Sequence, residues 1–150
     1  MAYTGELEER TLLRQGKGTY RYTNNVFKYQ GEWKQGKKHG MGIFTFGDGS
    51  SYEGEFVEGE IIGAGLRRWP NGSTYSGDFF MGEMEGEGIY ISNTGEKYEG
   101  TMKNNQRHGE GELTQTNGDV YQGEFHTNRR HGKGTEYLAS GEVYNGEFVR

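Results

Sequence analysis

Large and small residues alternate along this chain in short runs that are separated by glycine-rich turns. In the run YQGEW, the side chains of Tyr29, Gly31 and Trp33 fall on one face of a β-strand, and those of Gln30 and Glu32 fall on the other. The run GMGIFTF that follows is rich enough in β-branched and aromatic residues for a return strand. The segments that follow have compositions typical of turns, namely GDGSS, PNGST, NTGEK, TNGDV and ASGEV. The pattern predicts a series of β-hairpins.

The hairpins follow a strict period. A tyrosine recurs every 23 residues, at Tyr29, Tyr52, Tyr75, Tyr98, Tyr121 and Tyr144. A glycine follows two positions later, at Gly31, Gly54, Gly77, Gly100, Gly123 and Gly146. Next comes an acid in every copy except the one with Thr101, namely Glu32, Glu55, Asp78, Glu124 and Glu147. A repeat of this length indicates stacked structural units, each of which contacts its neighbours.

These columns, written YxGEW…GxxxGxG…DG, resemble the MORN repeat (membrane occupation and recognition nexus). The match covers residues 29–150 without an insertion. It divides one repeat domain, 1–150, into full repeats at 29–51, 52–74, 75–97, 98–120 and 121–143, with the start of a further repeat at 144–150. The resemblance implies a scaffold that links cytoskeletal, ciliary or membrane-proximal partners, sometimes with association between arrays.

The first 28 residues leave two interpretations open. Tyr3, Gly5 and Glu6 match the repeat, and Gly16 and Gly18 match its later glycine pair, which makes 3–28 a degenerate repeat with three extra residues in its turns. The alternative is a short helix over GELEERTLLR.

The turns are predicted from parity and from glycine. Gly36, Gly59 and Gly82 share a column with Asn105 and Asn128, and this interchange marks a left-handed backbone position. Because the period is odd, keeping the tyrosines on one face requires one even and one odd turn per unit, or a bulge. We expect the odd turns to be the NG/DG loops, with three residues that end in a left-handed glycine.

The glycines inside strands have a packing role in this scheme. Without side chains, Gly31 and Gly42 leave space on which tyrosine and tryptophan rings can lie. The predicted fold is therefore all-β, a twisted and curved single-layer antiparallel meander of stacked 23-residue hairpins whose core is an aromatic ladder on one face.

Composition agrees with this fold and excludes several functions. Only 30% of the 150 residues are hydrophobic, which is too few for a thick globular core. The chain has 28 glycines, which are too many for a helical fold. The net charge of −5 disfavours nucleic acid as a partner. There is no cysteine, and the N-terminal text lacks an apolar signal region, so we expect a cytoplasmic protein, associated with the cytoskeleton or cilium if the resemblance holds.

Catalytic, cofactor and metal sites are not predicted. GKGT at 16–19 and 132–135 lacks the spacing of a phosphate-binding loop. His39, His108 and His131 share a column of the repeat. Adjacent copies of this column lie two strands apart, on the order of 10 Å, which is too far for their side chains to bind one metal ion. We expect the periodic acids to accept hydrogen bonds from turn amides. A catalytic pair would instead need two carboxyl groups whose pKa values differ.

Partner binding is the favoured function. The aromatic-lined repeat face is predicted to bind a peptide or helix of another protein, because large aromatic and apolar side chains are good anchors. The candidate protein-binding residues, which also form the ladder, are Tyr29, Trp33, Tyr52, Phe56, Tyr75, Phe79, Tyr98, Met102, Tyr121 and Phe125.

Two further interactions are kept as alternatives. Lys37, Lys38, Arg129 and Arg130 lie in basic turns that could contact phosphoinositide headgroups, which would make the protein a membrane tether, although the acidic middle turns would repel an anionic bilayer. The C-terminal text YNGEFVR ends after the first strand of a hairpin, and an unpaired edge strand invites self-association.

Overall fold

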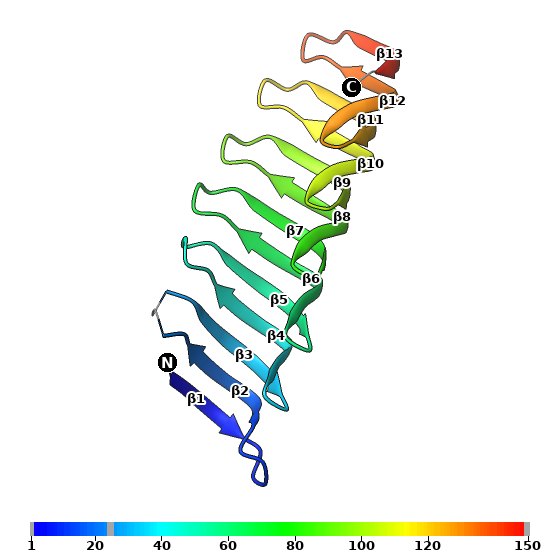
Figure 1. Ribbon diagram of the computed structural model, residues 1–150. Helices are drawn as coiled ribbons and strands as arrows, with labels where there is room; N and C mark the ends of the chain where they lie inside the picture. The colour runs from blue at the N-terminus through cyan, green and yellow to red at the C-terminus, as the bar shows by residue number, and fades with distance from the viewer. Residues whose placement is uncertain (1, 24–25, 149–150) are drawn as a thin grey trace. The chain divides into compact units, whose positions relative to one another are not determined.

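A computed structural model describes residues 2–23 and 26–148. Its strands pair antiparallel with their neighbours in chain order, in one thirteen-stranded sheet over the described residues (Figure 1). The same part of the chain contains no helix. The predicted all-β meander of hairpins in a single sheet is confirmed.

The strands have the following bounds. They are β1 Ala2–Leu7, β2 Arg14–Arg21, β3 Lys28–Lys34, β4 Lys37–Thr45, β5 Ser51–Val57, β6 Glu60–Arg68, β7 Thr74–Phe80, β8 Glu83–Ile91, β9 Lys97–Lys103, β10 Gln106–Thr114, β11 Val120–His126, β12 Arg129–Tyr137 and β13 Val143–Phe148. Contacts group the chain into a first unit, Met1–Pro70 with Phe79–Gly82, and a second unit, Asn71–Asp78 with Glu83–Arg150. Each unit is described by itself below.

Within a full repeat, the turn between the two strands has two residues. Lys34 pairs with Lys37, and the residues between them, Gln35 and Gly36, have φ angles of 49° and 82°. Two positive φ angles define the type I′ turn, whose twist matches that of the flanking strands. The predicted left-handed column is confirmed, because φ is positive at Gly36, Gly59, Gly82, Asn105 and Asn128.

The loop between repeats has three residues. The amide of Phe46 donates to the carbonyl of Ser50, and the amide of Gly49 donates to the carbonyl of Phe46. Gly49 is left-handed at φ 93°, as are Gly72, Gly95, Gly118 and Gly141. One even and one odd turn per repeat therefore keep the tyrosines in register, as the parity argument predicts.

A bulge in each return strand explains the acid column. Gly31 pairs with Gly42 and Trp33 pairs with Lys38, so Glu32 faces three residues of β4. The Glu32 carboxylate accepts a hydrogen bond from the Met41 amide at 2.8 Å. Equivalent bonds run from Ala64 to Glu55 (2.9 Å), Glu87 to Asp78 (3.1 Å) and Lys133 to Glu124 (3.2 Å). The donors thus belong to strand bulges, and the prediction of turn amides is corrected on this point.

The core is a row of edge-to-face aromatic contacts on one face of the sheet. In the first unit, the Tyr29 ring lies 5.0 Å from the rings of both Trp33 and Phe56, at interplanar angles of 85°. Tyr52 repeats this arrangement between Phe56 and Phe79, at 5.3 and 5.0 Å. In the second unit, Tyr121 lies between Phe125 and Phe148, at 5.1 and 4.9 Å. Each tyrosine therefore joins its own hairpin to the next one.

The strand-internal glycines lie beneath the tyrosine rings. A Cβ atom added at Gly42 would come within 2.5 Å of the Tyr29 ring, and one at Gly54 would come within 2.7 Å of the Tyr52 hydroxyl. Real Cβ atoms do not approach other heavy atoms so closely. The predicted packing role of these glycines is confirmed.

The N-terminal segment forms a hairpin of the same kind. Strands β1 and β2 occupy the region for which a helix was the alternative. The Tyr3 hydroxyl donates to the Glu6 carbonyl, and the Glu6 carboxylate accepts from the Lys17 amide, as in the later repeats. The first strand of a further repeat is present as β13, and the last two residues of 144–150 lie outside the described residues.

The glycine column provides a matched stability test. Gly54→Val should lower the free energy of unfolding by about 1–3 kcal/mol or more, because its Cβ would lie 2.5 Å from Ala64 O and would displace the Tyr52 ring. Gly146→Val, in the same column, should change stability little, because nothing lies within 4 Å of its Cβ. Urea unfolding followed by tryptophan fluorescence measures both. Equal losses in the two variants would contradict the packing role.

Candidate functional site

The ten residues predicted to bind a partner lie in the core. Their side chains are between 0% and 5% exposed. As arranged here they offer a partner almost no surface, so their contact role stays a prediction and the accessible residues around them define the candidate site. Tyr144 differs from its five counterparts in being 56% exposed on β13.

The tyrosine hydroxyls are used internally. Tyr29, Tyr52, Tyr98 and Tyr121 each donate to the backbone carbonyl three residues later, at 2.7 to 2.9 Å, and Tyr75 does so at 3.2 Å. Burial raises the pKa of Tyr52, Tyr75 and Tyr98 to about 12. The phenols therefore stay neutral as hydrogen-bond donors at any physiological pH.

Basic side chains of the return strands cover the aromatic core of the first unit. The Arg14 guanidinium lies 4.7 Å from the Trp33 ring centroid and 4.8 Å from that of Tyr20. The Lys38 ammonium lies 5.5 Å from the centroid of Phe44. These cation–π contacts place positive charge on the tyrosine face, where it also shields the rings from water.

Arg67 belongs to the same face, on β6. Its guanidinium lies 4.2 Å from the Phe46 ring centroid, and burial lowers its pKa from the ordinary arginine value. Its Nη2 donates to the Ser50 hydroxyl, which itself donates to Asp48.

Three guanidinium groups on the tyrosine face have a buried donor without an acceptor. Among the described residues, the Nε atoms of Arg14, Arg67 and Arg107 are buried and find no hydrogen-bond partner in the protein. The Nη2 atoms do have acceptors: that of Arg14 donates to the Gly36 carbonyl, and that of Arg107 donates to the Asn128 carbonyl. A buried donor that lacks an acceptor is costly, and an added acceptor would stabilise it.

Two hollows lie side by side on the tyrosine face of the first unit. One, of about 280 Å³, is lined by Arg14, Tyr20, Tyr22 and Trp33 among others, and the second, of about 140 Å³, by Phe44, Phe46, Phe56 and Ile61 among others. Lys38 and Gly59 line both hollows, so they form one groove, called here the first-unit groove. Glu58 and Glu60 stand at its turn-side rim.

The second unit has a comparable hollow of about 330 Å³, lined in part by Arg107, Leu113, Phe125, Arg130 and Phe148. Here the charge is partly neutralised, because Arg130 forms an ion pair with Glu136 at 3.1 Å. Arg107, Arg129 and Arg130 all line this hollow, whereas the first-unit groove combines Arg14, Lys37 and Lys38 with Glu58 and Glu60. The first-unit groove therefore differs in presenting charges of both signs.

The four basic residues proposed for lipid contact divide between environments. Lys38 and Arg130 lie over tyrosine rings, at 5.7 Å from Tyr29 and 4.9 Å from Tyr121. Lys37 and Arg129 are exposed at the starts of their strands, where they line the hollows of the first and second units. In each pair only one side chain is free of the aromatic core, and headgroup contact stays a prediction.

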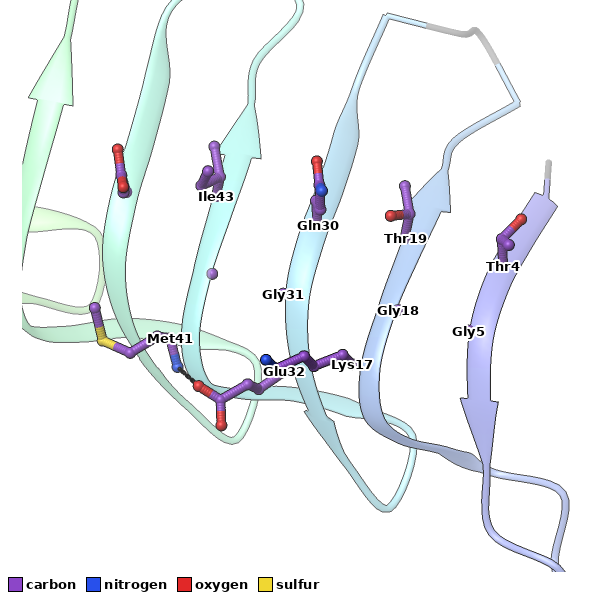
Figure 2. Close-up of a pocket in the computed structure, with 12 residues that line it drawn as sticks. Thr4, Gly5, Lys17, Gly18, Thr19, Gln30, Gly31, Glu32, Met41 and Ile43 are labelled. Atoms are coloured by element: carbon purple, nitrogen blue, oxygen red, sulfur yellow. Dashed lines mark hydrogen bonds between the residues drawn. The ribbon is translucent and has the colours of Figure 1, made fainter.

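The opposite face of the first unit has a groove with a glycine floor. Figure 2 shows Gly5, Gly18 and Gly31 in a row across the strands, with Thr4, Thr19, Gln30 and Ile43 along one side and Lys17, Glu32 and Met41 along the other. Its volume is about 540 Å³. Its floor is glycine backbone, and the Glu32 carboxylate at its side accepts the Met41 amide, so this groove is a consequence of the glycine packing.

The histidines are closer together than their column spacing suggests. His126 lies between His108 and His131, with ring centroids 4.9 and 5.5 Å apart. Spacing along one column overlooks His126, which projects from the neighbouring strand. Within the described ranges, no group of three or more His, Cys, Asp or Glu residues could hold a metal ion. These ranges also contain no helix of the length and hydropathy that crossing a bilayer requires.

The repeat geometry agrees with a known family. The MORN repeat family model matches residues 13–26, 29–51, 52–74, 75–97, 98–120 and 121–143. The chain belongs to the MORN repeat family. Within each repeat of this MORN array, residues of the tyrosine, glycine and acid columns make the contacts that hold the two strands of the hairpin together.

A solved structure shares the fold. The TCP domain of SAS-4 from Drosophila melanogaster, determined in complex with a proline-rich motif of Ana2, matches with a TM-score of 0.55 and 10% sequence identity. The match covers 89% of this chain and 73% of that chain. At this identity the likeness shows an extended sheet of the same type and transfers no residue roles.

Alkaline titration tests the burial of the tyrosines. The pKa of an unfolded tyrosine is about 10, and that of Tyr52, Tyr75 and Tyr98 in the fold is about 12. Because the folded pKa values are raised, the stability that these groups contribute is complete below pH 10 and is lost as the pH rises towards 12. Absorbance at 295 nm should show their ionisation together with the loss of sheet circular dichroism, whereas in urea they should titrate near 10. Ionisation near 10 with the sheet intact would contradict the prediction.

Proposed function

We propose that this MORN array is a non-enzymatic protein-interaction scaffold, and that the tyrosine face of the first unit binds a peptide or helix of a partner. The observation that carries the proposal is the first-unit groove, in which aromatic side chains lie beside Lys38 and beside Arg14, whose buried Nε lacks an acceptor in the described protein. Aromatic and arginine side chains are the residue types that contribute most to protein interfaces.

The repeat architecture supports this proposal. Stacked hairpins present the same columns at regular intervals, which suits an elongated ligand better than a compact one. Among the predicted binding residues of the first unit, Trp33 and Phe56 line the groove directly and would act as its floor. That a protein with this fold was solved with a proline-rich motif bound is consistent with peptide recognition by such sheets.

The cellular setting is proposed from the family. A scaffold of this type would link cytoskeletal, ciliary or membrane-proximal components in the cytoplasm. We propose no cofactor, because the side chains that line the groove would only bind a partner and would catalyse no reaction. The exposed edge strand β13, with Val143 and Tyr144 each 56% exposed, is proposed to allow association between arrays.

A peptide selection with face-specific variants tests the scaffold. Peptides enriched from a displayed random library on the immobilised full chain would be synthesised and titrated by fluorescence anisotropy. The double variant Phe46→Ser, Ile61→Ala should weaken their binding about tenfold or more, since both side chains line the first-unit groove. Ser92 occupies the column of Phe46, so the repeat accommodates this change.

The matched control is Met41→Ala, Ile43→Ala, which removes two exposed apolar side chains from the opposite face. Binding within about twofold of the wild type is expected there, as is usual for residues outside an interface. A larger loss in the control than in the groove variant would contradict the proposed face. Failure of any peptide to be enriched, together with salt-sensitive binding to phosphoinositide vesicles that needs Lys37 and Arg129, would favour the tether instead.

A further inference from the structure

The basic column of the return strands carries an inference about the partner. Three basic strand residues lie on the tyrosine face of the first unit, Arg14 on β2, Lys38 on β4 and Arg67 on β6, although the protein as a whole has a net charge of −5. Arg14 and Lys38 line the first-unit groove, and Glu58 and Glu60 line its turn-side rim. The groove is therefore basic along β2 and β4 and acidic at its rim.

One of these cations has an unmet electrostatic need. The Nε atom of Arg14 is buried without an acceptor in the described protein, whereas Arg67 is linked to the Asp48 carboxylate through the Ser50 hydroxyl. Desolvation without a paired anion is unfavourable, and a carboxylate is the acceptor whose geometry best fits a guanidinium. A partner with carboxylates would supply what the fold leaves out.

The spacing of the column limits the shape of that partner. Arg14, Lys38 and Ile61 occupy equivalent positions of successive repeats, since they pair with Leu7, Trp33 and Phe56. Successive members are two strands apart, which is about 9.6 Å at the usual strand spacing. Seven residues of an α-helix rise about 10.5 Å and return to nearly the same side of the helix. A helix along the groove would therefore present one residue to each repeat.

We propose that the first-unit groove is specific for an acidic amphipathic helix with carboxylates at i and i+7 and an apolar residue at i+14. The two carboxylates bind Arg14 and Lys38, and the apolar residue contacts Ile61. Glu58 and Glu60 at the turn-side rim repel acids placed outside this register. The inference rests on the proposed function, and it adds the class of partner.

Designed peptides test the charge pattern. A 21-residue alanine-rich helix with Glu at positions 3 and 10 and Leu at position 17 would be labelled and titrated against the full chain. It should bind at least tenfold more tightly than the same peptide with Gln at positions 3 and 10, and the advantage should shrink as salt is raised. A peptide with its two Glu residues five positions apart controls for net charge, because those side chains point to different sides of the helix.

Variants of the protein complete the test. Arg14→Gln with Lys38→Gln should remove the preference for Glu over Gln, whereas Lys17→Gln, an exposed change on the opposite face (Figure 2), should preserve it. Near-ultraviolet circular dichroism checks that the aromatic ladder is intact in each variant. Arg14→Gln alone should reduce the preference in part, so the inference remains testable if the double variant unfolds.

The outcomes separate this inference from the function on which it rests. Equal binding of the Glu and Gln peptides, equal binding of the two Glu spacings, or no binding of any designed helix would overturn the acidic-helix specificity. Peptides selected from a library could still bind through Phe46 and Ile61 in each of those cases. The reverse result, a Glu preference that persists in the double variant, would also overturn it, because the cations responsible would lie elsewhere.

Discussion

The packing of a tyrosine ring on bare glycine backbone is the constraint on which this structure depends. The Tyr29 ring lies over Gly31 and Gly42, so closely that neither position has room for a Cβ atom. A single sheet has no second layer to bury its apolar face, and aromatic rings packed edge to face along it bury one another instead. The glycines are the condition for that arrangement.

Other features of the repeat follow from this contact. Pressing the ring onto the paired strands places its hydroxyl beside the backbone, where it donates to the Glu32 carbonyl. The return strand bulges around the same region, and the Glu32 carboxylate accepts the Met41 amide that the bulge releases from the ladder. In the repeat that has Thr101 at the acid position, the Thr101 hydroxyl instead donates to the Glu87 carboxylate of the neighbouring strand.

The sequence predicts the fold well because its period is strict and each column has one physical cause. Turn length, left-handed positions and the tyrosine face all follow from an odd repeat of 23 residues, and each is found as expected. The candidate site is predicted less well for a physical reason. Large aromatic residues signal burial and binding equally, and only the depth of Tyr52 or Phe56 in the ladder decides between them.

The residues that cover the ladder have a weaker sequence signal: the sequence indicates lipid contact for Lys38 and Arg130, and it indicates no role for Arg14 or Arg107. Arg14, Lys38, Ile61, Met84, Arg107 and Arg130 each stand two residues before the first glycine of the GxG pair. The column tolerates arginine, lysine, isoleucine and methionine, so it does not appear as a conserved letter of the repeat. Cation–π contacts explain this tolerance, because a long basic side chain and an aliphatic one both cover the rings beneath.

That tolerance also explains how a repeat with fixed folding columns can become specific. Positions that fold the hairpin are nearly identical from copy to copy and cannot distinguish one partner from another. Positions that only cover the ladder are free to change charge, and a partner laid along the array meets them in order. In the first unit that order is basic, basic, aliphatic, at Arg14, Lys38 and Ile61. Recognition by such an array thus depends on the sequence of covering residues, while stability depends on the tyrosines and glycines beneath them.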